Sequence, residues 1–264
     1  MRLHLKRWTS CALLTAGLCA LKSAATPGVS AVATSRMRQL PRLTVWAWER
    51  REDLRAIDPR STAIAYLTKT VVLDAHGLAV TPRHQGLLLP AAEELVRIPV
   101  VRIETGEGAE LTDATAELAA AAIVEAVSQS SAALQIDFDA KASERVWYRS
   151  VLARVRLKLP AKMPLSMTAL ASWCSYDNAW LHDLPVDEAV PMLFRMEPDR
   201  RQFAPNQLRD VAREFLLREP KCMDAVGIST REAWPRELAR RRVYVFADRG
   251  WQRDGLEETV RELW

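Results

Sequence analysis

The stretch Leu134-Gln135-Ile136-Asp137-Phe138-Asp139 decides the fold that we expect for this chain. Its period-two alternation turns Gln135, Asp137 and Asp139 to one face of a strand and the three apolar residues to the other. A strand that ends in carboxylates and precedes an amphipathic helix is typical of a (β/α)8 barrel, which presents functional groups at the C-terminal ends of its strands. The alternative is that one aspartate caps the next helix and the other pairs with an arginine. We favour a site, because a cap accounts for only one of the carboxylates.

The rest of the chain alternates predicted strands with predicted helices. Strands are predicted from apolar and β-branched runs at 43–48, 63–67, 99–104, 134–139, 165–170, 189–194, 225–228 and 242–246. Helices are predicted at about 112–127 and 147–159, between 205 and 220, and after 254. Residues 70–73 and 78–81 flank a turn and form a hairpin. This order predicts an α/β protein, a single (β/α)8 TIM-type barrel with a small β-hairpin insertion after strand 2.

Residues 1–25 have the three parts of a secretory signal peptide. Basic residues precede an apolar run from Cys11 to Leu21, and Ser23-Ala24-Ala25 offers a cleavage site. The run is short for a bilayer span, so we expect export and cleavage rather than a permanent anchor. Cys19 also allows a lipid anchor, but Leu18 stands where the usual motif has a small residue. We therefore expect a periplasmic or secreted protein with no stable membrane span after cleavage, a disordered lead at 26–40 and the barrel domain at 41–264.

Removal of the signal makes the chain formally neutral. The whole sequence has 37 Lys and Arg against 33 Asp and Glu, and residues 1–25 contain four of the basic residues and none of the acidic ones. The remainder carries 33 of each sign, which gives no electrostatic reason to bind nucleic acid. We interpret Arg240-Arg241-Arg242 as a solvated loop, and we expect a monomer without a nucleic-acid partner.

Two of the four cysteines lie in the signal, which leaves Cys174 and Cys222. They lie after the fifth and before the seventh predicted strand, with the sixth strand between them. A disulfide requires Cα atoms within about 7 Å, so we expect unpaired or only weakly coupled thiols. No cluster of potential ligands has metal-binding spacing, and we expect neither a metal nor another cofactor.

Polar and aromatic residues recur where the predicted strands end, which is the functional face of such a barrel. The candidates for catalysis are Asp139, Asp137 and Glu104. The candidates for substrate binding are Trp48, Glu49, Tyr66, Arg102, Gln135, Thr168, Trp173, Arg195 and Asp248. Tryptophan rings at strand ends can stack on the faces of sugars, and the alternative for each is packing in the core. The tryptophans at such positions are Trp46, Trp48, Trp173 and Trp251.

Four segments also carry a resemblance: VWAWER (45–50), QIDFD (135–139), LSMTALASWC (165–174) and DEAVPMLFRM (187–196). With them, residues 41–250 resemble a family of exported bacterial proteins catalogued only as a domain of unknown function, which implies location and fold but no activity. More remotely, the order of strands four to six is similar to chitinase-like glycoside hydrolases of family 18. That family places its catalytic acid two residues after the second aspartate of strand four. Here this position is Lys141, which cannot act as a carboxylic acid.

Together these features predict a carbohydrate-active, glycoside hydrolase-like enzyme whose substrate is an extracytoplasmic poly- or oligosaccharide. Glycoside hydrolysis generally uses one protonated and one ionised carboxyl group. We expect Asp139 to be the acid, because the charge of Asp137 opposes its ionisation, and Glu104 to be the second carboxylate. The supporting groups are the cations Arg102 and Arg195, with Glu49 as a reserve carboxylate.

Two alternatives to an enzyme are open at this point. A non-catalytic glycan-binding barrel would keep the tryptophans and the hydrogen-bonding groups but lack an acid. Lys141 favours this interpretation, whereas the two aspartates of strand four oppose it. A structural or assembly protein would have a filled barrel mouth.

Overall fold

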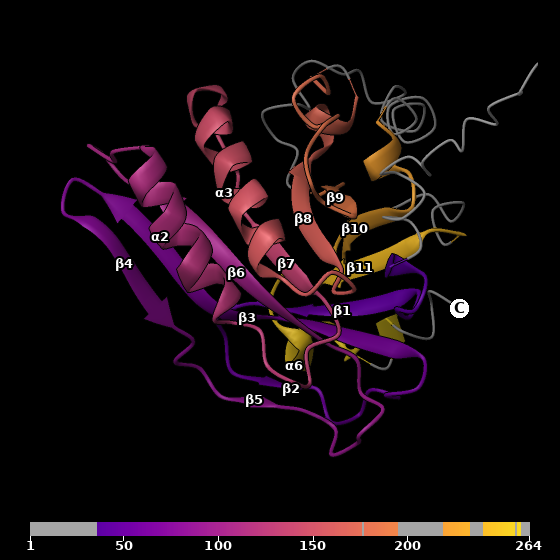
Figure 1. Cartoon of the computed structure of the whole chain (residues 1–264). Coiled ribbons are helices and arrows are strands. Elements are labelled where there is room, and N and C mark those ends of the chain that lie inside the picture. The colour runs from indigo at the N-terminus through magenta and orange to yellow at the C-terminus, as the bar shows by residue number, and fades with distance from the viewer. Residues whose placement is uncertain (1–35, 176, 195–218, 233–239, 257, 260–264) are drawn as a thin grey trace, which may run out of the picture.

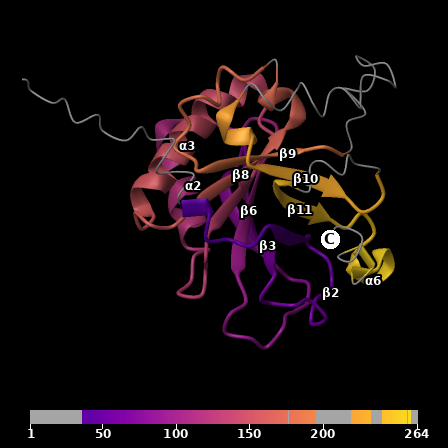
Figure 2. The ribbon, with the colours of Figure 1, turned by 90° about the vertical axis from the view of Figure 1, so that its right-hand side faces the viewer.

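The computed structural model describes residues 36–175, 177–194, 219–232, 240–256 and 258–259. In this part of the chain, eight parallel strands pair in the order β1, β11, β10, β9, β8, β7, β6, β3, and β3 pairs with β1 to close the barrel (Figures 1 and 2). The strands of the barrel are β1 (Leu43–Ala47), β3 (Thr62–Asp74), β6 (Arg97–Thr105), β7 (Leu134–Asp137), β8 (Leu165–Leu170), β9 (Glu188–Met192), β10 (Ala225–Ser229) and β11 (Arg242–Phe246). The predicted (β/α)8 TIM-type barrel is therefore confirmed.

Two described helices pack side by side on the outside of the barrel, α2 (Asp113–Val124) and α3 (Arg145–Lys158), as Figure 1 shows. Thr112 caps α2 and forms a reciprocal capping box with Thr115, and small alanines let the helix lie close to the sheet. The buried apolar residues of α3 recur at helical spacing, and the helix ends before Pro160. A short helix, α6 (Trp251–Asp254), follows the last strand. The helix predicted between 205 and 220 lies mostly outside the described residues.

The hairpin departs from the predicted form. The second strand and the first hairpin strand are one continuous strand, β3, which pairs antiparallel with β4 (Gly77–Pro82) beyond the barrel. Gly77 has a φ of +105° in the turn, a conformation that favours glycine. Two further short strands, β2 (Glu52–Asp53) and β5 (Leu87–Leu88), pair in parallel and connect the loops after β1 and before β6.

A buried polar chain crosses the barrel interior. The Nε1 of Trp46 donates to Gln135 over 2.7 Å, and the amide of Gln135 donates to Ser166 over 3.1 Å. Lower in the barrel, Glu188 accepts hydrogen bonds from Tyr244 at 2.8 Å and from Arg242 at 2.6 Å. Burial raises the pKa of Glu188, and the charge of Arg242 opposes this rise. These bonds satisfy polar groups that would otherwise be costly to bury.

The same network corrects the interpretation of the basic cluster 240–242. Arg242 is not in a solvated loop, because its guanidinium lies inside the lower end of the barrel and also donates to the carbonyls of Met37 and Pro41. Met37 and Leu40, from the segment expected to be a disordered lead, are buried in the inner apolar cluster. Arg36 pairs with Asp187 over 2.5 Å. Residues 36–40 therefore close the N-terminal end of the barrel, while the rest of the expected lead lies outside the described residues.

The prediction of unpaired thiols is wrong: Cys174 and Cys222 form a disulfide with Cα atoms 5.9 Å apart. The prediction assumed that the cysteines follow the positions of the barrel strands, but neither cysteine lies in the barrel wall. They lie on two short 3-10 helices, Ala171–Cys174 and Pro220–Cys222, that both contact β9 from outside. The strand between them therefore brings the two cysteines together.

No helix among the described residues is long and apolar enough to cross a membrane. The expected signal peptide lies outside those residues.

Candidate functional site

The parallel register of β6 and β7 places Arg102 opposite Asp137 at the C-terminal end of the barrel. The guanidinium of Arg102 donates to the Oδ2 of Asp137 over 2.8 Å, and the hydroxyl of Thr168 on β8 donates to its Oδ1 over 2.7 Å. Both oxygens of this carboxylate, which is only 2% exposed, are therefore bonded. The arginine and hydroxyl partners compensate for the burial of this carboxylate.

Asp139, two residues further on, has a different environment. It is exposed, and it has no hydrogen bond or ion pair among the residues that the structure describes. The surrounding protein raises the pKa of Asp139 by desolvation, the charge of Asp137 raises it further, and the charge of Arg102 lowers it. Asp139 therefore holds its proton more readily than an ordinary aspartate and can present it to a molecule at the barrel mouth.

Glu104 occupies the corresponding position on β6, two residues beyond Arg102. Its side chain is 51% exposed and accepts from the Nε of Arg102 over 2.8 Å. Arg102 thus joins Glu104 and Asp137, one carboxylate on each side. Glu104 and Asp139 each lie two residues beyond the paired Arg102 and Asp137, Glu104 on β6 and Asp139 just past the end of the neighbouring β7.

Trp48 lies just past β1 and ends a column of aromatic rings. Its ring centroid is 4.2 Å from that of Trp46 and 6.0 Å from that of Phe246. The guanidinium carbon of Arg102 lies 5.8 Å from the centroid of the Trp48 ring. Trp48 is half-buried, so it lies at the edge of the mouth next to Arg102. A half-exposed indole of this kind can stack on an apolar sugar face.

The structure thus brings together Asp137, Asp139, Glu104, Arg102, Thr168 and Trp48. Gln135 lies one layer deeper, bonded to Trp46 and Ser166. Glu49 accepts from the backbone N–H groups of His84 and Gln85 at 2.9 and 2.8 Å, so it holds a loop. Arg195 lies outside the described residues.

Three further candidates have structural contacts away from this group. Tyr66 packs against the outer apolar cluster, and burial raises its pKa. Trp173 is 1% exposed and packs edge to face on Trp180 with ring centroids 4.7 Å apart, so it cannot stack on a sugar. The main-chain carbonyl of Asp248 accepts from Arg50 over 2.6 Å. Trp251 is also buried and donates to the carbonyl of Trp46.

Sequence reasoning missed Glu144, a buried carboxylate beside the mouth. It accepts from Thr105 and from the backbone N–H of Lys141, each over 2.6 Å, and lies 3.4 Å from the Lys141 Nζ. Glu144 therefore fixes the loop that follows Asp139 to the end of β6. Its spacing three residues after Lys141, just before a helix, resembles a capping pattern and was the available signal.

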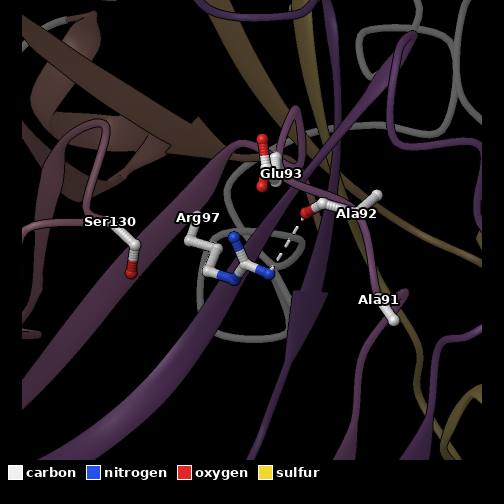
Figure 3. A pocket seen from close by; sticks show the side chains of 5 residues that line it. All are labelled: Ala91, Ala92, Glu93, Arg97 and Ser130. Carbon is white, nitrogen blue, oxygen red and sulfur yellow. Dashed lines mark hydrogen bonds between the residues drawn. The ribbon is translucent and has the colours of Figure 1, made fainter.

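No group of three or more His, Cys, Asp or Glu residues in the described chain is arranged to hold a metal ion. The hollow in Figure 3 is also separate from the carboxylates. It has a volume of about 650 Å³ and is lined by Ala91, Ala92, Glu93, Arg97 and Ser130, which precede or begin β6 and β7. It therefore lies at the N-terminal ends of these strands, the face of a (β/α)8 barrel that usually serves stability.

Fold and site define a (β/α)8 barrel with carboxylates, an arginine and a tryptophan at its mouth. No family model matches the chain, and no curated protein matches it. Among solved structures, it is similar to the crystal structure of the Bacillus cereus spore cortex-lytic enzyme SleL, with 14% identity and a TM-score of 0.41 over 71% of this chain. The match spans 50% of the length of that enzyme chain. At this TM-score the similarity does not establish a relationship, and the fold assignment depends on the strand pairing alone. The family resemblances stay predictions.

Proposed function

We propose that this protein is a glycoside hydrolase-like enzyme that acts on an extracytoplasmic poly- or oligosaccharide. The observation that supports the proposal best is the contrast between Asp137 and Asp139. The first is buried and bonded at both oxygens by Arg102 and Thr168, whereas the second is exposed at the mouth with a raised pKa. A titratable group with a perturbed pKa at a barrel mouth, next to an ion-paired carboxylate, is typical of an active site.

In the proposed reaction, Asp139 donates its proton to the glycosidic oxygen while the bond from that oxygen to the anomeric carbon breaks. The carboxylate of Glu104 forms an ester bond to the anomeric carbon. Water then attacks this carbon and releases Glu104, and Asp139 takes the proton of the water. We propose the retaining course, which requires carboxyl groups about 5 Å apart, because Glu104 on β6 and Asp139 just past the end of β7 follow neighbouring strands, which are spaced by about 4.8 Å. An inverting course requires a separation of about 6.5 to 9.5 Å.

A glycan-binding barrel without turnover is the second candidate. The observation in its favour is Lys141, which stands at the position of the acid in the family that the chain remotely resembles. Its side chain is 73% exposed and forms an ion pair with Glu144. Binding would then depend on Trp48 and the polar groups around Arg102.

An extracytoplasmic location has two supports. The order of residues 1–25 predicts export, and the disulfide between Cys174 and Cys222 is of a kind that persists in oxidising compartments and is rare in the cytosol. A glycan outside the cytoplasm is consistent with both.

The test is to incubate the purified mature protein with bacterial surface polysaccharides and to measure new reducing ends, with binding measured in parallel. The enzyme proposal predicts products, and NMR of the first product should show retention of the anomeric configuration. Binding without products would favour the glycan-binding alternative. Neither binding nor products would count against both and leave a structural or assembly role.

A further inference from the structure

The long strand β3 changes the direction of its side chains where it leaves the barrel. Its register against β6 shifts between Leu67 and Lys69, which leaves Thr68 as the extra residue of a β-bulge. Before the bulge, odd-numbered residues such as Ala65 pair with the inward-facing residues of β6. After it, the even-numbered residues Thr70 and Val72 take these positions.

As a consequence, β3 has two different faces above the barrel. Val71 and Leu73 are buried in the outer apolar cluster with α2. Thr70 and Val72 are only partly buried and lie on the opposite face, the face of Arg102 and Glu104. Bulges of this kind are common next to active sites, where they redirect side chains.

Strand register extends this face from the candidate site to the hairpin. Thr70 is paired with Arg102 on one side and with Thr81 of β4 on the other. One row higher, Val72 is paired with Glu104 and with Ala79. The distance from β7 across β6 and β3 to β4 is three strand spacings, or about 14 Å. We call the surface formed by Thr70, Val72, Ala79 and Thr81 the hairpin wall.

The chemistry of the hairpin wall suits a sugar chain better than a protein. Its side chains are small, and Ala79 and Thr81 are exposed. It lacks the aromatic, methionine and arginine side chains that are enriched in the centres of protein interfaces. Two threonine hydroxyls on a sheet face that is continuous in register with Arg102 and Glu104 can hydrogen-bond to the hydroxyl groups of a glycan.

We infer that the hairpin wall binds a polysaccharide chain that runs from the carboxylates across β6, β3 and β4, so the substrate is a polymer and not a small glycoside. This inference depends on the proposed function for the identity of the ligand. It adds that sugar units several positions away from the scissile bond contribute to binding.

Two exposed neighbours on β4 provide a matched test. Ala79→Glu places a longer, charged side chain on the hairpin wall. Val80→Glu places the same side chain on the opposite face, at a residue that is 41% exposed and pairs with Val71. Both variants are made in the Asp139→Asn protein to prevent cleavage. Binding is measured by electrophoresis through gels that contain glycol chitin, hydroxyethyl cellulose, xylan or dextran, and competition with the disaccharide of the retarding polymer is measured in solution.

We expect Ala79→Glu to weaken polymer binding at least about tenfold, or about 1.4 kcal/mol, without changing the affinity for the disaccharide. Val80→Glu should bind both ligands as the parent does. Unchanged polymer binding by Ala79→Glu, an equal loss in Val80→Glu, or no retardation by any of the four polymers would overturn the inference. Retardation without hydrolysis by the wild-type protein would refute only the proposed enzymatic function, so the two failures are distinguishable.

Discussion

Replacement of Asp139 by asparagine separates a catalytic role from a structural one. The substitution keeps the size of the side chain and removes the transferable proton. General acid catalysis contributes about 10² to 10⁴ in rate, so turnover should fall by that factor, or about 3 to 5 kcal/mol in activation free energy.

Stability should respond differently. Asp139 has no hydrogen bond or ion pair among the described residues, so its replacement by asparagine removes no such contact there. Because the pKa of Asp139 is raised in the folded protein, the folded state binds this proton more tightly than the unfolded chain does. This carboxyl group therefore makes the folded state less stable as the pH rises from its ordinary pKa through its raised pKa. At pH 7 the variant should unfold at the same or a slightly higher denaturant concentration than the wild type.

The activity of the wild type should depend on pH through the same group. A proton donor works only while it is protonated, so the rate should fall as the pH rises through the raised pKa of Asp139. Reducing-end assays across pH and urea unfolding at pH 4 and pH 7 measure both effects, and Asp183→Asn is the control for an exposed aspartate outside the site. Full activity of Asp139→Asn would refute the assignment, and Glu104 would be the next residue to test. A loss of about 1 kcal/mol or more in stability with normal turnover would instead indicate a structural role.

The remaining predictions concern the barrel and its export. Arg242→Met should lower the free energy of unfolding by about 3 to 5 kcal/mol, because it removes the cationic partner of the buried Glu188. Urea unfolding of Arg242→Met with and without Glu188→Gln measures this, and an equal loss in both would contradict it. The double variant Cys174→Ala/Cys222→Ala should lose about 4 kcal/mol in the chain-entropy model for a sequence separation of 48 residues, and denaturant unfolding that matches the wild type would contradict the disulfide. Exported protein should begin shortly after Ala25, and mass spectrometry that finds an intact Met1 would exclude cleavage.

Local periodicity in the sequence determined the elements of the fold. The strands at 165–170 and 242–246 were predicted with the bounds that the structure has. Alternation along 134–139 also assigned the faces correctly, since Leu134 and Ile136 lie in the outer core while Asp137 points to Thr168 and Arg102. Such predictions succeed because a buried strand must alternate and an outer helix must repeat its apolar face, and both rules act between near neighbours in sequence.

The sequence also determined which carboxylates meet at the mouth, but not their roles. Any barrel gathers its strand ends, so Glu104, Asp137 and Asp139 had to be near one another once the fold was known. Whether Arg102 reaches Asp137 as well as Glu104 depends on the register of β6 against β7, to within one residue. A shift of one residue would turn Arg102 away from Asp137.

Only the tertiary structure decided the contacts between distant segments. In the sequence Arg242 belongs to a basic cluster, but closure of the barrel places its side chain inside the barrel against Glu188. Cys174 and Cys222 are separated by a strand in sequence, yet both approach the outer side of β9. The bulge in β3 has no local signal in the apolar pattern and still decides which residues form the hairpin wall. These features depend on register and chain closure, which act between residues far apart in the sequence and leave no periodicity to read.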